Sequence, residues 1–244
     1  VATIPDLVAW YEPVLDSSFN SSNTFDGTSL TNANGGSWFD NSPARSNHAI
    51  IGGIAPMYEE IGINSLPTVN FSSSATLTFN ASYLNQKDYT IFIVEQKMAT
   101  TAIQRFLNLG NTAATNAFGY GSNTTITGTT GAVSATVPGL VRTKYAPRIV
   151  TFFTNSNDAS PSTARRVYVN GTVGGTTASA ATLTTLASSV GLIGADATAA
   201  TPTSPYTGFI SELIIYNRAL KADERNDIQN YLSKKYGIKV ASSS

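Results

Sequence analysis

The sequence has no cysteine, one histidine and few charged residues. Without cysteine the chain forms neither disulfides nor thiolate metal sites, and one histidine disfavours a zinc site. Charged residues make up 12% of the chain and the formal net charge is zero, so no strong electrostatic field attracts nucleic acid or an anionic membrane. We therefore expect neither nucleic acid nor a membrane among the partners.

Long apolar runs are also missing. None approaches the roughly 18 residues that would span a bilayer. The N-terminal VATIPDLVAWY lacks the basic stretch and apolar core of a secretory signal, although a mature chain after cleavage would look the same.

What the chain does contain is a series of short β-type runs separated by Gly, Asn, Ser and Pro. Strands are predicted at residues 7–11, 68–71, 75–79, 89–95, 103–109, 117–120, 148–154, 166–169, 190–193 and 208–216. Because strands and helices do not alternate, a parallel α/β sheet is disfavoured. The pattern predicts an all-β sandwich of two antiparallel sheets that occupies residues 1–244 as one domain.

One helix is predicted near the C-terminus, over residues 222–236. Acidic residues fill its first turns, Lys234 and Lys235 lie in its last turn, and Gly237 follows as a terminator. One apolar stripe of this helix is formed by Ile228, Tyr231, Leu232 and Tyr236. A helix this short is marginal alone, so we expect it to pack on the sandwich.

Several motifs together identify a family. They are LVAWY from Leu7, SWFDNSPARSNHA from Ser37, LPTVNF from Leu66, YTIFIVEQ from Tyr89, RVYVNG from Arg166, GLIGAD from Gly191 and the strand–turn–helix unit at 208–237. In this order they resemble the concanavalin A-like, laminin-G-like jelly-roll modules of bacterial surface proteins, polysaccharide-processing enzymes and phage structural proteins. The resemblance implies a jelly-roll sandwich with one concave sheet and a short C-terminal helix.

Ligand binding on such a module would use exposed aromatic rings with amides nearby, because a ring stacks on the apolar face of a sugar. Trp38, Tyr58, Tyr120 and Tyr206 lie in or beside predicted loops. Asp40, Asn47 and His48 share the loop after Trp38. The ligand-binding residues predicted are Trp38, Asp40, Asn47, His48, Tyr120 and Tyr206.

Each loop residue also has a structural interpretation. For Asp40 we favour an Asx-turn, in which its carboxylate accepts a backbone N–H and holds the loop. For His48 we favour a loop residue that is hydrogen-bonded to its neighbours. The chain is expected to need no cofactor, but Ca²⁺ is the ion that suits the fold. Its candidate ligands are Asp40, Asn41 and Asp196, with Asn47 and Asp26 in addition.

Catalysis would need paired carboxylates, and no closely spaced E-x-D-x-E pattern occurs. Glu95 and Glu212 are solitary within their predicted strands, so a catalytic pair would require them to meet in space. The structural alternative for Glu212 is a salt bridge with Arg218.

These observations favour a non-enzymatic structural or adhesive module on a virion surface, such as a phage capsid decoration or fibre domain, with possible glycan binding. Its partners would then be other virion or surface subunits in a homo-oligomer or larger assembly, and a cell-surface polysaccharide. The alternatives are a carbohydrate-binding module of a secreted or cell-surface bacterial protein and, less favoured, a glycoside hydrolase.

Overall fold

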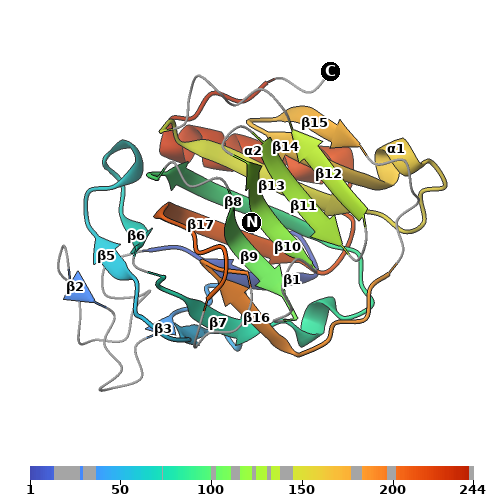
Figure 1. Ribbon diagram of the computed structural model, residues 1–244. Helices are drawn as coiled ribbons and strands as arrows, with labels where there is room; N and C mark the ends of the chain where they lie inside the picture. Colours follow the sequence, from blue (N-terminus) through green and yellow to red (C-terminus); the bar gives the residue numbers. More distant parts are fainter. Residues whose placement is uncertain are drawn as a thin grey trace.

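The computed structural model describes residues 1–13, 28–29, 37–72, 74–99, 103–110, 116–122, 125–130, 133–137, 145–176, 183–196 and 202–241. Its strands form two antiparallel sheets packed face to face, with the helix α2 behind one of them (Figure 1). The predicted all-β sandwich with a C-terminal helix is therefore confirmed. No helix in the described part of the chain is both long and apolar enough to cross a bilayer.

The nine-stranded sheet has the order β15-β14-β13-β8-β17-β6-β5-β2, and β1 also pairs with β17. Its strands are β1 (Leu7–Tyr11), β2 (Thr28–Ser29), β5 (Met57–Glu59), β6 (Thr68–Phe71), β8 (Thr90–Lys97), β13 (Arg148–Thr154), β14 (Arg165–Val169), β15 (Thr172–Thr176) and β17 (Gly208–Tyr216). The central strands β8, β13 and β17 are buried along almost their whole length, which fits their near-continuous apolar sequences.

The eight-stranded sheet has the order β12-β11-β10-β9-β16-β7-β4-β3. Its strands are β3 (Ser37–Trp38), β4 (Ala49–Ile51), β7 (Leu77–Asn80), β9 (Gln104–Leu109), β10 (Ala117–Ser122), β11 (Thr125–Thr130), β12 (Val133–Val137) and β16 (Val190–Ile193). Short helical segments, Ile63–Ser65, Ser82–Leu84 and α1 (Pro161–Ala164), lie in the connections.

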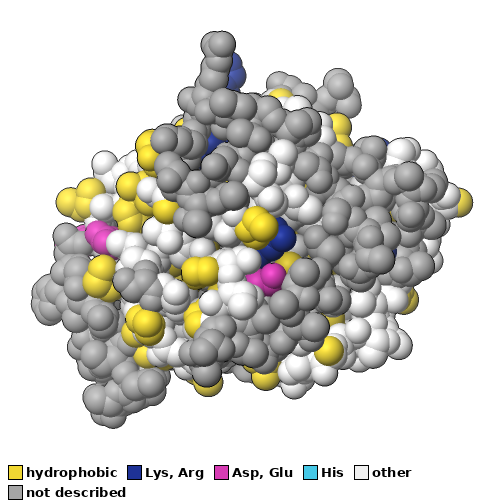
Figure 2. Space-filling view, in the orientation of Figure 1, with side chains coloured by type: hydrophobic (Ala, Val, Ile, Leu, Met, Phe, Trp, Pro, Cys, Tyr) yellow, Lys and Arg dark blue, Asp and Glu magenta, His cyan; other side chains and the backbone are white. Residues whose placement is uncertain are grey.

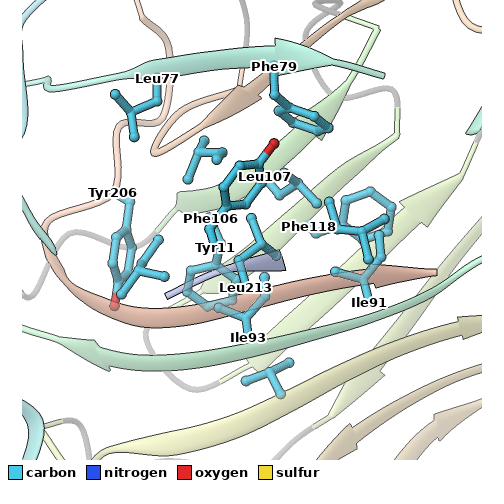
Figure 3. Close-up of a cluster of buried hydrophobic side chains, with 14 of the residues drawn as sticks. Tyr11, Leu77, Phe79, Ile91, Ile93, Phe106, Leu107, Phe118, Tyr206 and Leu213 are labelled. Carbon is cyan, nitrogen blue, oxygen red and sulfur yellow. The ribbon is translucent and has the colours of Figure 1, made fainter. Parts of the chain in front are cut away.

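The main core lies between the two sheets (Figure 3). Ile91 and Ile93 of one sheet face Phe106 and Phe118 of the other, and all four side chains are buried. A second core, which contains Phe92 and Val94, lies on the opposite face of β8. Adjacent side chains of a strand point to opposite faces, so β8 contributes to both layers.

The ten predicted strands all exist, five of them with the bounds expected from the sequence. The strands β2, β3, β4, β5, β11, β12 and β15 were not predicted as individual elements. Most are two or three residues long or rich in Thr and Gly, so their apolar periodicity is too short to recognise locally.

The C-terminal helix α2 (Ala222–Tyr236) begins and ends where the sequence indicated. Its buried face, which includes Ile228, Leu232 and Tyr236, packs in the second core. Gly237 ends the helix with a φ of 62°, a left-handed conformation that glycine adopts without strain. The expected packing of this helix on the sandwich is confirmed.

A β-bulge at Ser211 sets the side-chain directions along β17. Ile210 pairs with Glu95 and Glu212 with Val94, so one extra residue lies on β17. Beyond the bulge Leu213 and Ile215 remain in the main core, whereas Glu212 turns toward α2. The bulge therefore places a carboxylate between the sheet and the helix.

Glu212 is fully buried and accepts four hydrogen bonds. The donors are Trp10 Nε1 at 2.8 Å, Lys235 Nζ at 2.7 Å, Tyr236 OH at 2.9 Å and Tyr231 OH at 3.1 Å. Burial raises the pKa of Glu212, and the Lys235 ammonium opposes this shift. The predicted Glu212–Arg218 salt bridge is wrong, because the bulge directs Glu212 to the last turn of α2.

Arg218 instead holds the first turn of α2. Its NH1 and NH2 groups donate to the two carboxylate oxygens of Glu224 at 2.8 and 2.7 Å. Glu224 also accepts the backbone N–H of Lys221 at 2.8 Å, which satisfies a donor at the helix start. The hydrogen bonds from Arg218 lower the pKa of Glu224 to about 2.

We predict that Glu224→Gln lowers stability near neutral pH by about 1 kcal/mol, which corresponds to about 2–4 °C in melting temperature. Because the folded-state pKa lies below the ordinary 4.5, this stabilisation is complete above that value and is lost as the pH falls toward about 2. Thermal unfolding of the wild type and of Glu224→Gln from pH 7 to pH 2 measures the difference in their melting temperatures. Asp227→Asn, in the same helix, is the control, and a gap between wild type and Glu224→Gln that persists at pH 2 contradicts the assignment.

Candidate functional site

The loop between β3 and β4 is organised around the buried carboxylate of Asp40. Its Oδ1 accepts the backbone N–H groups of Trp10 at 2.9 Å and Ser42 at 2.8 Å. Its Oδ2 accepts the Ser42 hydroxyl at 2.7 Å and the Asn47 N–H at 3.2 Å. The bond to Ser42 N–H, two residues on, is the expected Asx-turn. Asp40 therefore shapes the loop through these four hydrogen bonds.

Asn47 joins this loop to β7. Its side-chain amide donates to the backbone carbonyl of Asn80 at 3.0 Å and accepts the Asn80 N–H at 2.8 Å. The Tyr11 hydroxyl donates to the Asn47 carbonyl oxygen. Asn47 is buried, so this amide serves as a strand-like link that fixes the loop to the sheet.

His48 is exposed at the end of this loop and is held in one orientation. The Asp40 N–H donates to His48 Nδ1 at 3.0 Å, and the ring of Phe39 lies 5.0 Å from the imidazole, centroid to centroid. Because Nδ1 is an acceptor, the neutral imidazole carries its proton on Nε2. His48 thus presents a fixed N–H donor.

A groove of about 250 Å³ lies beside His48 on the outer face of the eight-stranded sheet. Leu77 and Phe79 point into the core (Figure 3), so their neighbours Thr78 and Asn80 point outward. The pairing of β7 with its neighbours places Ile50 opposite Thr78 and Val190 opposite Asn80. The groove, named here the His48 groove, is lined by His48, Ile50, Thr78, Phe79, Asn80, Ser189 and Val190.

The His48 groove combines two exposed apolar side chains with neutral hydrogen-bonding groups. Ile50 is 54% exposed and Val190 37% exposed. Asn80 Oδ1 accepts the Ser82 N–H at 2.9 Å, which orients the amide and leaves its N–H groups available. No charged residue lines the groove in the described part of the chain. Among the coloured atoms of Figure 2, which views the molecule as in Figure 1, few are charged side chains.

The predicted aromatic binding residues are not on the surface. Trp38 and Tyr206 are fully buried, and Tyr58 and Tyr120 are 1% exposed. The expectation that these rings face solvent is wrong, because strands β3, β5 and β10 direct Trp38, Tyr58 and Tyr120 into the core. A sugar cannot stack on these rings unless the sandwich opens.

Tyr120 and Tyr206 belong to a buried polar cluster around Glu95. Their hydroxyls donate to the Glu95 carboxylate at 2.9 and 2.7 Å, and Arg148 NH1 lies 3.5 Å from it. Lys97 Nζ lies 4.3 Å from the centre of the Tyr120 ring. Burial raises the pKa of Glu95, and the Arg148 charge opposes this shift.

Glu95 and Glu212 do not form a catalytic pair. Glu95 lies on the core face of the nine-stranded sheet with Tyr120, whereas Glu212 lies on the helix face with Tyr236. Both carboxylates are completely buried. The alternative of a joint catalytic site is therefore wrong in this structure.

The candidate calcium ligands that the structure describes come from two places in the fold, the loop between β3 and β4 and the end of β16. Asp40 is engaged as described above, while Asp196 follows β16 and accepts the Asn108 amide N–H at 2.8 Å. Asn41 lies beside Asp40, and Asp26 lies outside the described residues. Within the described ranges, no cluster of three or more His, Cys, Asp or Glu side chains could hold a metal ion.

His48 is a predicted ligand-binding residue that lines the groove, whereas Ile50, Thr78, Asn80, Ser189 and Val190 were not predicted. The alternation in LTFN, with Leu77 and Phe79 inward, already pointed Thr78 and Asn80 outward. Which residues of β4 and β16 lie opposite them depends on strand register, a long-range property that no local pattern provides.

A comparison with protein families identifies the fold. The concanavalin A-like lectin/glucanases superfamily matches residues 60–224, more than half of the chain. The chain belongs to this superfamily. No curated protein sequence matches this chain.

Several solved structures are similar to this chain at low sequence identity. A sialidase of Trypanosoma rangeli in complex with sialic acid is 14% identical with a TM-score of 0.61, and the match covers 96% of this chain and 34% of the sialidase chain. A structure of botulinum neurotoxin type C, whose cell entry depends on two ganglioside molecules, is 12% identical with a TM-score of 0.59, covering 93% of this chain and 51% of the toxin chain. The carbohydrate-binding module CBM40 of a Ruminococcus gnavus sialidase is 15% identical with a TM-score of 0.49, covering 66% of this chain and 96% of the module.

The likenesses to the sialidase and to the toxin show a shared fold. The protein spans about a third of the length of the sialidase chain and about half of the toxin chain. It therefore corresponds to one part of each of these two proteins.

We predict that Asp40→Ala lowers the free energy of unfolding by about 2–4 kcal/mol, because it leaves several buried donors without an acceptor. Urea denaturation measures the change. Asp158→Ala is the matched control, since partly exposed Asp158 accepts the Ser160 N–H at 2.9 Å in the same two-residue turn. An equal, small effect of both substitutions contradicts a structural role for Asp40.

Proposed function

We propose that the protein is a non-catalytic carbohydrate-binding module that holds a sugar in the His48 groove. The observation that carries this proposal is the pairing of exposed Ile50 and Val190 with the oriented polar groups of His48 and Asn80. A sugar ring has apolar C–H faces and hydroxyls at its rim, so it needs both kinds of contact. The groove offers them on the rigid strands of a sheet.

The positions of the acidic residues support a binding role. Glycoside hydrolysis ordinarily uses two carboxylates on either side of the scissile bond, about 5–9.5 Å apart. Glu95 and Glu212 are enclosed on opposite faces of one sheet, and no acidic residue lines the His48 groove among those described. We therefore infer that this module binds sugars and does not cleave them.

The comparisons support a carbohydrate as the class of ligand. The superfamily is named for lectins and glucanases. Among the structures of the same fold, one is a sialidase with sialic acid bound and another is a toxin that depends on gangliosides. Sialylated glycans therefore belong among the probes, beside neutral ones.

The proposal predicts that wild type binds at least one class of glycan on an array and that His48→Ala and Asn80→Ala each weaken this binding about tenfold. Each substitution removes oriented hydrogen bonds, and about 1.4 kcal/mol corresponds to tenfold in affinity. Isothermal titration with the soluble form of the bound glycan measures the change.

The control for this experiment is Tyr145→Ala, a 44% exposed aromatic residue whose carbonyl accepts a hydrogen bond from Gln96, at the far end of β8. Affinity should be unchanged in this variant, and circular dichroism should show that all variants remain folded. Absence of binding to neutral and sialylated glycans alike overturns the proposal.

A second candidate is a structural or adhesive subunit on a particle surface, such as a phage capsid decoration or fibre domain. It is favoured by exposed aliphatic side chains: Ile50 and Ile54 are 54% and 55% exposed, and Ile61 is 70% exposed. Such side chains suit packing against other subunits. Surfaces poor in Lys and Glu also lose less side-chain entropy when buried.

This second candidate predicts a symmetric oligomer in solution, or co-purification with a capsid or tail protein from particles that carry the chain. Light scattering with size-exclusion chromatography measures the first, and Ile54→Ser should shift any oligomer toward the monomer. A strict monomer that binds glycans assigns the module to secreted or cell-surface carbohydrate binding instead.

A further inference from the structure

A second hollow, of about 580 Å³, lies at the end of the sandwich where β8 begins and where β13 and β17 end. We name it the end cleft. Its lining includes Gln86, Lys87, Asn155, Asn157, Leu183 and Asn217. The volume lies within the range of about 300–1,000 Å³ that is typical of ligand sites.

The end cleft is rich in side-chain amides. The Asn217 amide donates to the Tyr83 carbonyl at 3.3 Å, and the Gln86 amide donates to the Thr185 hydroxyl at 3.0 Å. These bonds use amide N–H groups and leave the oxygens free to accept. Asn157 is exposed, and Leu183 adds an apolar surface that is 48% exposed. Amides beside one apolar side chain match the hydroxyls and C–H face of a sugar.

Most charges at the end cleft are already neutralised or hydrogen-bonded. The Asp88 carboxylate accepts the Ser156 N–H and hydroxyl, both at 2.8 Å. Arg218 pairs with Glu224 and with Asp6. Lys87 is exposed and makes no ion pair among the described residues, so its ammonium is available as a hydrogen-bond donor. The cleft thus offers donors and acceptors with little net charge.

One chain segment forms a wall of both hollows. Residues 183–190 contribute Leu183 to the end cleft and Ser189 and Val190 to the His48 groove. Hydrogen bonds fasten this segment to residues 81–86: Ala81 N to Ser189 O at 2.6 Å, Gln86 N to Thr184 O at 3.0 Å and Leu186 N to Asn85 Oδ1 at 2.9 Å. Seven residue steps span at most about 25 Å when fully extended, which an oligosaccharide of several units can reach.

We propose that the end cleft is a second sugar-binding subsite and that the module binds an oligosaccharide chain across the cleft and the His48 groove. This inference rests on the proposed carbohydrate-binding function. The shared wall at 183–190 fixes the distance between the two hollows. One oligosaccharide that occupies both therefore loses its translational and rotational freedom only once.

The experiment titrates maltooligosaccharides, cellooligosaccharides and chitooligosaccharides of one to six units, and sialyllactose, by isothermal calorimetry. For the series that binds, affinity should rise as the chain becomes long enough to reach both hollows. The double variant Lys87→Ala with Asn157→Ala should then weaken the longest oligosaccharides about tenfold and leave the shortest ligand unchanged. His48→Ala should weaken short and long ligands together.

The matched control is Asn230→Ala with Lys234→Ala, which removes the same two side-chain types from the exposed face of α2. It should leave every affinity unchanged. If the cleft variant binds long chains as wild type does while His48→Ala weakens them, the second subsite is overturned and the proposed function stands. If affinity does not depend on chain length, the subsite is likewise overturned, and if no probe binds wild type, both proposals are.

Discussion

The extra residue Ser211 in β17 determines how the two cores of this protein are filled. β17 pairs with β8 along one edge, and with β6 and β1 along the other, so its side chains contribute to both faces of the nine-stranded sheet. The bulge keeps Ile210 and Leu213 in the main core and turns Glu212 toward α2. With a regular register, Glu212 would share the core face with Ile210, where its charge would lack the Lys235 partner.

The helix α2 and the His48 groove lie on opposite sides of the sandwich, and each depends on a buried carboxylate whose two oxygens are hydrogen-bonded. Glu212 accepts hydrogen bonds from β1 and α2, and Asp40 accepts hydrogen bonds from β1 and from its own loop. A buried carboxylate is tolerated only when its oxygens are hydrogen-bonded. Trp10 contacts both, through its indole N–H and its backbone N–H. The strand β1 therefore connects α2, which covers the nine-stranded sheet, to the loop that carries His48.

The fold and the candidate site differ in how far the sequence predicts them. The bounds of β1, β6, β13, β16, β17 and α2 follow from local apolar patterns and from the charges and glycine at the helix ends. The aromatic residues were harder, since a ring beside a predicted loop can face either way. Trp38 is buried because it lies in β3, and Tyr120 because β10 continues past it to Ser122, so that it lies inside the strand and not at its end. The Tyr206 hydroxyl reaches the buried Glu95 carboxylate.

Local periodicity, turn chemistry and composition predict the all-β class, the terminal helix and the zero net charge from the sequence, but for Asp40 they left a structural turn and a binding role both open. The partner of Glu212, the separation of Glu95 from Glu212, and the meeting of His48 with Ile50, Asn80 and Val190 follow from the tertiary structure. Strand register and bulges set these contacts. They arise from pairing between segments distant in the chain, which side-chain alternation within one strand does not specify.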